Sequence, residues 1–224
     1  MAIGPEPLAS FDTFSTGDAV ANAAALAHLR GVAAQRGAPV YLWGPSGCGK
    51  TYLLRALTHE MQLRGERAGW FEAGTAVPWA FDESWSLVVL DGCDLYDDAQ
   101  QRAAFALLID AAAQGAQVAA AGAVPPVDLP LRDDLRTRLA WGHVFALEAL
   151  DESDARAVLR READRRGIFL SDDVMGYLLT RFSRDLKHLM ALLDRLDEFA
   201  LAEHRAITVP LLRKMFEQEG AHLA

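Results

Sequence analysis

One stretch of eight residues constrains this chain more than any other. Residues 44–51 fit the pattern Gly-x-x-x-x-Gly-Lys-Ser/Thr. The apolar run Val40–Trp43 precedes them and predicts a strand, and Tyr52–Leu57 follows with helical spacing. In this order the loop suits an anion, because its glycines let successive N–H groups turn inward and the helix N-terminus adds partial positive charge. The sequence therefore predicts that the chain binds a nucleoside phosphate.

The fixed positions of this loop have expected roles. Lys50 is expected to reach the β- and γ-phosphates, and the Thr51 hydroxyl is expected to ligate Mg²⁺. The predicted nucleotide-binding residues are Gly44, Pro45, Ser46, Gly47, Cys48, Gly49, Lys50 and Thr51.

A carboxylate at the end of a second apolar run is the other expected metal ligand. The run Ser86–Leu90 is unbroken and leads into Asp91. A strand without alternation is typical of a parallel sheet buried on both faces, and ligand sites lie at the carboxyl edge of such sheets. Asp91 is therefore expected to hold Mg²⁺ together with Thr51, and a turn-capping carboxylate is the structural alternative.

The residue after Asp91 limits the expected chemistry. Many ATPases of this kind place a second acid there to orient or activate water, but here it is Gly92. Asp94 could take over only if the backbone turned it back toward the site. We therefore expect nucleotide binding with slow intrinsic hydrolysis.

The order of the remaining patterns predicts an α/β fold followed by helices. Further strands are expected at 69–72, 117–121 and 143–147, with helices at 22–30, 50–64 and 101–113. Strands that alternate with helices indicate a five-stranded parallel sheet. Phe11 and Phe14 precede these elements, and they either wall a nucleotide base or pack against the core.

From Asp151 onward only helical patterns remain. They cover 151–166, 171–181, 183–204 and 208–218, with Ser171, Ser183 and Thr208 where N-caps are expected. We therefore expect three segments: a lead-in at 1–10, an α/β nucleotide-binding domain at 11–150 and an all-α lid domain at 151–224.

Composition narrows the classes of partner. The net charge of −9 argues against nucleic acid as the main ligand, because proteins that hold DNA phosphates present a basic face.

No apolar run approaches the ~18 residues of a membrane span, and no secretion signal is recognised. The two cysteines give no disulfide scaffold, so a cytoplasmic protein is expected. The six histidines show no pair at metal-ligand spacing, so only Mg²⁺ is expected.

Three arginines precede the last predicted strand. Arg132, Arg136 and Arg138 lie in a segment that also carries two aspartates. An arginine here could project into a neighbouring nucleotide site and stabilise the transition state. The alternative is a solvated helix face with intrahelical ion pairs. Arg184, after Ser183, could point from the helical domain toward the phosphates.

These motifs together resemble the AAA+ module of the bacterial replication initiator DnaA and, more closely, the Hda family of its small homologues. The similarity runs from about Phe11 to Phe216. The entry segment 11–14 with Gly17 and Asn22, and the run Leu135–Gly142, are similar to that module. The chain ends soon after the lid, where DnaA continues into a helix-turn-helix domain, and this favours Hda.

The resemblance implies roles for two arginines. Arg138 corresponds to the arginine finger, which acts in trans, and Arg184 to the sensor 2 arginine. Ala123 stands where such proteins often carry a polar sensor 1 residue. Gly92 in place of the second acid suits a protein that acts on the ATP of another.

The function implied is negative regulation of chromosomal replication initiation. The protein, carrying ADP or ATP and Mg²⁺, would dock on DnaA and stimulate its ATP hydrolysis together with the DNA-loaded sliding clamp. In the Hda family the ADP form is the active one. Residues 1–10 lack the glutamine-containing clamp-binding peptide of that family. The alternatives are a helicase-loader-like ATPase and a passive nucleotide-bound adaptor. Direct DNA binding is not expected to be strong, and the oligomeric state, including a homodimer, stays open.

Overall fold

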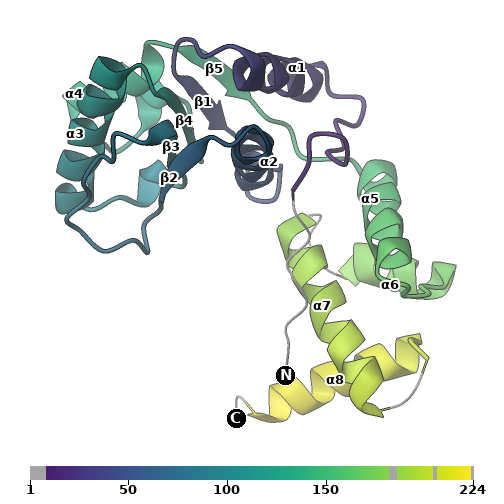
Figure 1. The fold of residues 1–224 in the computed structure, drawn as a ribbon. Coiled ribbons are helices and arrows are strands. Elements are labelled where there is room, and N and C mark those ends of the chain that lie inside the picture. The colour runs from purple at the N-terminus through teal and green to yellow at the C-terminus, as the bar shows by residue number, and fades with distance from the viewer. Residues whose placement is uncertain (1–8, 182–185, 204–205, 223–224) are drawn as a thin grey trace. The chain divides into compact units, whose positions relative to one another are not determined.

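The computed structural model describes residues 9–181, 186–203 and 206–222. The chain divides into two compact units, residues 1–148 and 149–224. The sequence placed the corresponding boundary near Leu150. Each unit is described by itself below (Figure 1).

The first unit is built on a parallel five-stranded sheet. Its strands are β1 (Val40–Trp43), β2 (Arg67–Phe71), β3 (Trp85–Leu90), β4 (Gln117–Gly122) and β5 (His143–Ala146). Their order is β2-β3-β4-β1-β5, so β4 is inserted between β1, which precedes the glycine-rich loop at residues 44–51 (the P-loop), and β3, which precedes Asp91. The predicted five-stranded sheet is confirmed. The alanines of β4 form a strand because both neighbours pair with it and all six of its residues are buried.

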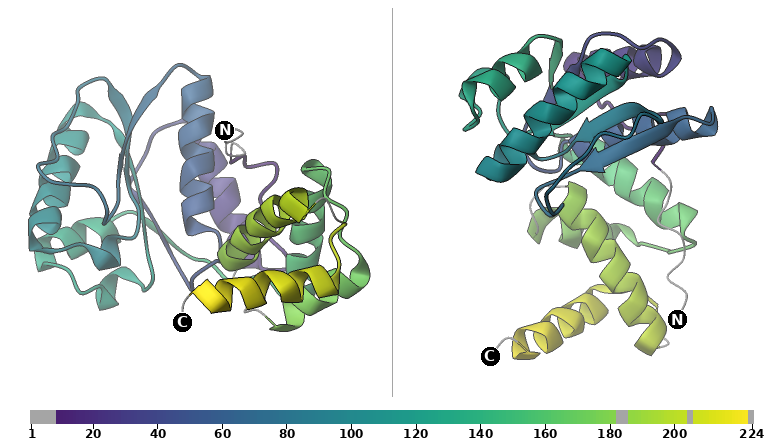
Figure 2. Two further views of the ribbon diagram at one scale, coloured as in Figure 1. Left: turned by 90° about the horizontal axis from the view of Figure 1, so that it is seen from below. Right: turned by 60° about the vertical axis from the view of Figure 1, so that its left-hand side comes forward.

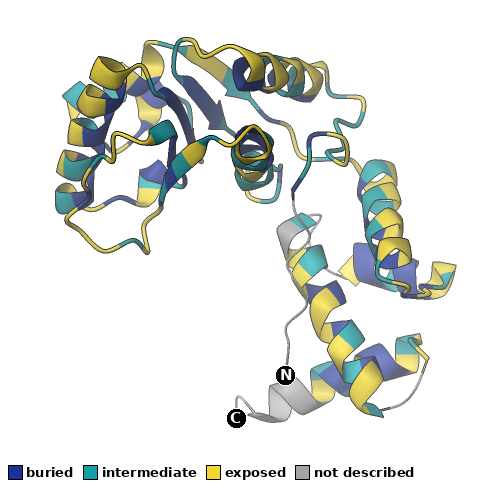
Figure 3. Ribbon diagram, in the orientation of Figure 1, coloured by how far each residue is buried: buried dark blue, intermediate teal, exposed yellow. Residues whose placement is uncertain are grey.

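Helices cover both faces of this sheet. Residues of α1 (Val20–Ala34) and α2 (Lys50–Leu63) share one apolar core with alternate strand residues. Residues of α3 (Asp98–Gln114) and α4 (Asp133–Ala140) form the second core on the other face. Figures 1 and 2 show this three-layer arrangement, and Figure 3 shows the central strands buried between the helices. The single-turn helices η1 (Cys93–Leu95) and η2 (Pro126–Asp128) follow β3 and β4.

The second unit is helical in its described part. It contains α5 (Glu152–Arg165), α6 (Asp172–Arg181), α7 (Leu186–Glu203) and α8 (Val209–His222) around a leucine-rich core of its own. Ser171 and Thr208 act as the predicted N-caps, since their hydroxyls accept the N–H groups of Val174 and Leu211 at 3.4 Å. Ser183 lies outside the described residues. No described helix combines the length and the apolar character that a membrane span requires.

Candidate functional site

The glycine-rich loop lies between the carboxyl end of β1 and the start of α2, as predicted. Its lysine is directed into the loop itself, since Lys50 Nζ donates to the carbonyl oxygens of Gly44 at 2.7 Å and Pro45 at 2.9 Å. Cys48 is buried beside it, with its sulfur 3.8 Å from the ammonium nitrogen. The loop therefore holds a cation at the N-terminus of a 14-residue helix, where anions are favoured.

An aromatic side chain packs directly against this loop. Gly49 has φ +100°, and a Cβ there would lie 2.6 Å from the ring of Phe14, so the position accepts only glycine. Phe14 also stacks on Tyr52 at 6.0 Å between ring centroids. Phe11, by contrast, is buried in the core of the α1 and α2 face. The structure thus separates the two aromatics that the sequence left together: Phe11 is core and Phe14 lies beside the loop.

The expected metal ligands are in direct contact. The hydroxyl of Thr51 donates to Asp91 Oδ2 at 2.8 Å, across 40 residues of sequence. Asp91 follows β3, and its main chain is held by two bonds: Asp91 N donates to Phe71 O at 2.9 Å, and Tyr96 donates to Asp91 O at 3.3 Å. The main chain of Asp91 is therefore held in place, and the bond from Thr51 orients its carboxylate.

Burial sets the electrostatics of this carboxylate. Desolvation raises the pKa of Asp91, and repulsion from Glu72 adds to the increase, while the hydrogen bond from Thr51 opposes it. The side chain has little exposed surface, with a relative accessibility of 8 % for the residue. A buried carboxylate with a raised pKa is stabilised in its charged form by a nearby cation, as expected for a metal or substrate site.

The segment after Asp91 turns the next acid to the end of β4. Gly92 adopts a left-handed conformation and leads into η1. This turn brings Asp94 Oδ1 to within 2.9 Å of the main-chain N–H of Ala123, which donates to it. The carboxylate of Asp94 thus binds the main chain at the end of β4. The side chain of Ala123, at the expected sensor 1 position, is only a methyl group.

The three arginines of the α4 segment differ in their partners. Arg132 pairs with Asp134 at 2.7 Å, and Arg136 pairs with Asp133 at 2.5 Å. Arg138 lies in the last turn of α4 and has no carboxylate partner among the described residues. Its guanidinium lies over the ring of Phe105 in α3, 5.8 Å from the centroid. The ion-paired helix face therefore describes Arg132 and Arg136, and among the described residues Arg138 is the one of the three without a carboxylate partner.

An exposed tryptophan follows Arg138 in the sequence. Trp141, one turn after Arg138, is 80 % exposed, although its main-chain N–H donates to Arg138 O at 3.3 Å. Arg184 lies outside the described residues. The contact of Phe105 with Arg138 carried no signal in the sequence, because it joins two helices that are far apart along the chain.

Two family models match separate parts of the chain. The model of the Hda lid domain matches residues 151–216. The model of the bacterial DnaA ATPase domain matches residues 6–68, which include the whole glycine-rich loop. The two matches fall in different compact units, with one in the α/β unit and one in the helical unit.

Solved structures show the same fold. Domain III of the replication initiation protein DnaA from Thermotoga maritima has a TM-score of 0.79 at 18 % identity, covering 95 % of this chain and 97 % of that chain. AMPPCP-bound DnaA from Aquifex aeolicus has a TM-score of 0.68 at 20 % identity, covering 86 % of this chain and 66 % of that chain. The RuvB Holliday junction branch migration motor of Thermotoga maritima has a TM-score of 0.68 at 17 % identity, covering 93 % of this chain and 71 % of that chain.

The fold and the family matches agree on one assignment. The α/β unit carries a P-loop and a β4 strand inserted between β1 and β3, and the helical unit matches the lid of Hda. The chain is therefore an Hda-like protein of the DnaA-related AAA+ group.

Proposed function

We propose that this protein binds an adenine nucleotide with Mg²⁺ and restrains replication initiation by stimulating ATP hydrolysis on DnaA. The nucleotide would occupy residues 44–51, with the phosphates on the loop N–H groups and Lys50. Phosphate oxygens are stronger acceptors for an ammonium group than the carbonyls that Lys50 contacts here. The adenine nucleotide is supported by the AMPPCP-bound DnaA of the same fold.

The residues present suit Mg²⁺. Thr51 and Asp91 offer hydroxyl and carboxylate oxygens, the hard donors that this ion prefers, and they already touch at 2.8 Å. When bound, the ion would neutralise charge on the phosphates and relieve the cost of burying Asp91. Gly92 supplies no acid to activate water, so the protein's own hydrolysis is expected to be slow.

The observation that carries the regulatory part of the proposal is the state of Arg138. The two other arginines of the segment are neutralised by aspartates, whereas Arg138 is exposed at the end of a helix and rests on an aromatic ring. Such a cation is available to an anion outside the molecule. Inserted beside the γ-phosphate in the site of DnaA, an arginine finger accelerates hydrolysis by ~10³-fold or more. Arg184 would act as the sensor 2 arginine on the nucleotide of this chain.

Trp141 supports the same surface. Exposed tryptophans next to an arginine are typical of the central contacts of protein interfaces. The carbonyl of Arg138 and the N–H of Trp141 are hydrogen bonded, so the two side chains leave the same rigid helix end. We propose that Trp141 docks against DnaA beside the nucleotide and that Arg138 enters the site.

The test is the hydrolysis of ATP by DnaA from the same organism, with and without this protein, in the presence of DNA-loaded sliding clamp. We expect stimulation by the unaltered protein and its loss in Arg138→Ala, with nucleotide binding retained. Arg136→Ala is the matched control, because it removes the same charge from the same helix but from an ion-paired position.

Each outcome separates the candidates. Equal stimulation by Arg138→Ala and the unaltered protein would remove Arg138 from the mechanism. Stimulation without clamp would remove the clamp from it. Steady hydrolysis by the purified protein alone would favour a helicase-loader-like ATPase. Absence of any effect on DnaA, together with stabilisation by bound nucleotide, would favour a passive adaptor.

A further inference from the structure

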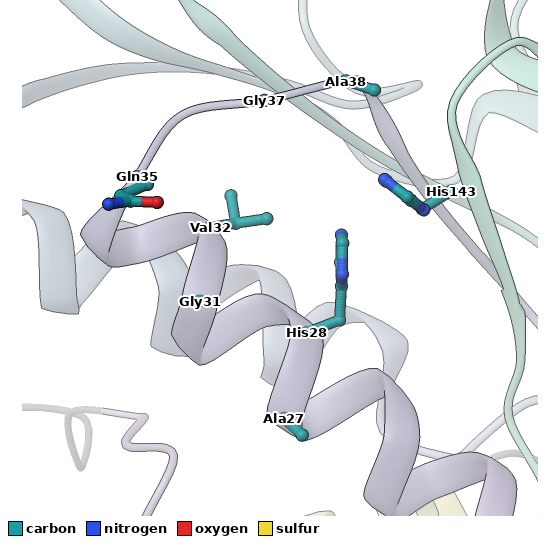
Figure 4. Close-up of a pocket in the computed structure, with 8 residues that line it drawn as sticks. All are labelled: Ala27, His28, Gly31, Val32, Gln35, Gly37, Ala38 and His143. Atoms are coloured by element: carbon teal, nitrogen blue, oxygen red, sulfur yellow. The ribbon is translucent and has the colours of Figure 1, made fainter.

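A pocket lies at the opposite end of the strands from the P-loop. It has a volume of about 350 Å³ and is lined by one side of α1, the turn before β1 and the first residue of β5 (Figure 4). The P-loop leaves the carboxyl end of β1, whereas this pocket lies at the amino ends of β1 and β5. It is therefore separate from the nucleotide site proposed above.

Two histidines face each other in this pocket. His28 comes from α1 and His143 from β5, and their ring centroids are 4.3 Å apart with an angle of 53° between the planes. Figure 4 shows the ring of His28 rising from the helix toward His143. His28 Nε2 is buried and has no hydrogen-bond partner. Burial, and then repulsion from His143, lower the pKa of His28 and so favour its neutral ring.

The backbone around His143 is held rigidly. Its N–H donates to Pro39 O at 2.8 Å, and a Cβ on the preceding Gly142 would lie 1.8 Å from that same carbonyl oxygen. The two chain segments therefore approach so closely that only glycine fits between them. His28 lies in the middle of a 15-residue helix that packs on the sheet. Both rings are thus carried by fixed elements, as a preorganised site requires.

The opposite wall of the pocket is fixed as well. The buried amide of Gln117 accepts from Gly37 N at 2.8 Å and donates to Ala38 O at 3.1 Å. These two bonds hold the turn before β1, which lines the pocket next to His143. This wall of the pocket is consequently held by hydrogen bonds to a buried side chain and is not a loose loop.

We propose that His28 and His143 bind one transition-metal dication of the Zn²⁺, Ni²⁺ or Cu²⁺ class. Neutral imidazole is a preferred ligand of these ions, and bonds of ~2.1 Å from one ion to two rings require the rings to lie side by side. A shared ion gives the buried Nε2 of His28 the partner that it lacks.

The remaining positions on the ion fall to water. Among the described residues no group of three or more His, Cys, Asp or Glu side chains is placed to hold a metal, so the protein supplies two ligands. The pocket has room for several water molecules. A site of this kind is expected to bind more weakly than a closed three- or four-ligand site.

The test uses the full chain without an affinity tag, with excess Mg²⁺ and ADP present to occupy the P-loop. Titration with Zn²⁺ is expected to give one equivalent bound, with affinity reduced about tenfold or more in His28→Ala and in His143→Ala. With Cu²⁺ as probe, the electron paramagnetic resonance spectrum is expected to show two coordinated ring nitrogens in the unaltered protein and one in each variant. His59→Ala, in α2, is the matched control and should bind as the unaltered protein does.

The result that overturns the proposal is equal Zn²⁺ affinity in the unaltered protein and both variants, or no binding at all. His143 is exposed, so its replacement leaves the fold intact even if that of His28 does not. None of these readouts depends on DnaA, and the proposed function stands or falls separately.

Discussion

Asn22 and Glu148 lie 126 residues apart and are joined by a reciprocal pair of hydrogen bonds. The amide of Asn22 donates from Nδ2 to Glu148 O at 3.0 Å and accepts the N–H of Glu148 on Oδ1 at 2.9 Å. Asn22 is fully buried in α1, and Glu148 is the last residue of the first compact unit. One side chain thus satisfies both main-chain groups of the residue that ends the first unit.

Replacing Asn22 with Ala should destabilise the first unit by about 2–3 kcal/mol, because two main-chain groups of Glu148 lose their partner near a buried helix. Urea unfolding followed by tryptophan fluorescence measures this unit alone, since all five tryptophans precede Glu148. The control is Gln35→Ala, which removes an exposed amide at the end of the same helix. Equal midpoints for Asn22→Ala and Gln35→Ala would contradict the prediction.

Asp91→Asn should separate stability from metal binding. The pKa of Asp91 is higher in the folded chain than in the unfolded chain, where an aspartate has a pKa of about 3.9. Ionisation of Asp91 therefore destabilises the fold as the pH rises above that value, and this destabilisation is present at pH 7. The amide variant keeps the hydrogen-bond acceptor for Thr51 and removes that charge. We expect an equal or higher melting temperature without ligand, but Mg²⁺-dependent nucleotide affinity lower by about tenfold or more. A lower melting temperature would show that the ionised carboxylate stabilises the fold.

Trp141→Ala should weaken docking without changing the chemistry. Because Trp141 lies beside Arg138 but does not contribute the charge, we expect the concentration for half-maximal stimulation of DnaA to rise about tenfold, with the plateau rate unchanged. Leu63→Ala, another exposed apolar residue at the end of α2, is the control and should match the unaltered protein. A reduced plateau at saturation would assign Trp141 to the catalytic geometry instead.

The histidine pair should make the first unit sensitive to acid. The pKa of His28 is lowered in the folded chain, so the unfolded chain takes up the proton more readily. The free energy of unfolding should fall as the pH drops below about 6.5, the pKa of a histidine in the unfolded chain, toward the lowered pKa of His28 in the folded chain. In the presence of a chelator, His28→Gln should lose less melting temperature between pH 8 and pH 5.5 than the unaltered protein. His59→Gln is the control, and an equal loss in all three proteins would argue against a role for His28.

The local features of the site could be predicted from the sequence alone. The P-loop is a contiguous pattern whose glycines, lysine and threonine act through backbone geometry and one short helix end. The run before Asp91 and the change to helices near Asp151 are also local signals, because burial on both faces leaves an unbroken apolar run and burial of one helical stripe leaves a period of about 3.6 residues. The five strands and the helical nature of the second unit therefore followed from the sequence, and the structure and family matches agree with them.

Only the tertiary structure decided how distant segments meet. Three arginines within seven residues are alike in sequence, and packing of α4 on α3 left Arg138 on Phe105 while aspartates paired with the other two. Spacing rules found no metal-ligand pair among six histidines, yet α1 and β5 bring His28 and His143 to 4.3 Å. Such contacts depend on which side chains the sheet order places together. Sequence periodicity reports the face on which a residue lies but not the residue that lies opposite it.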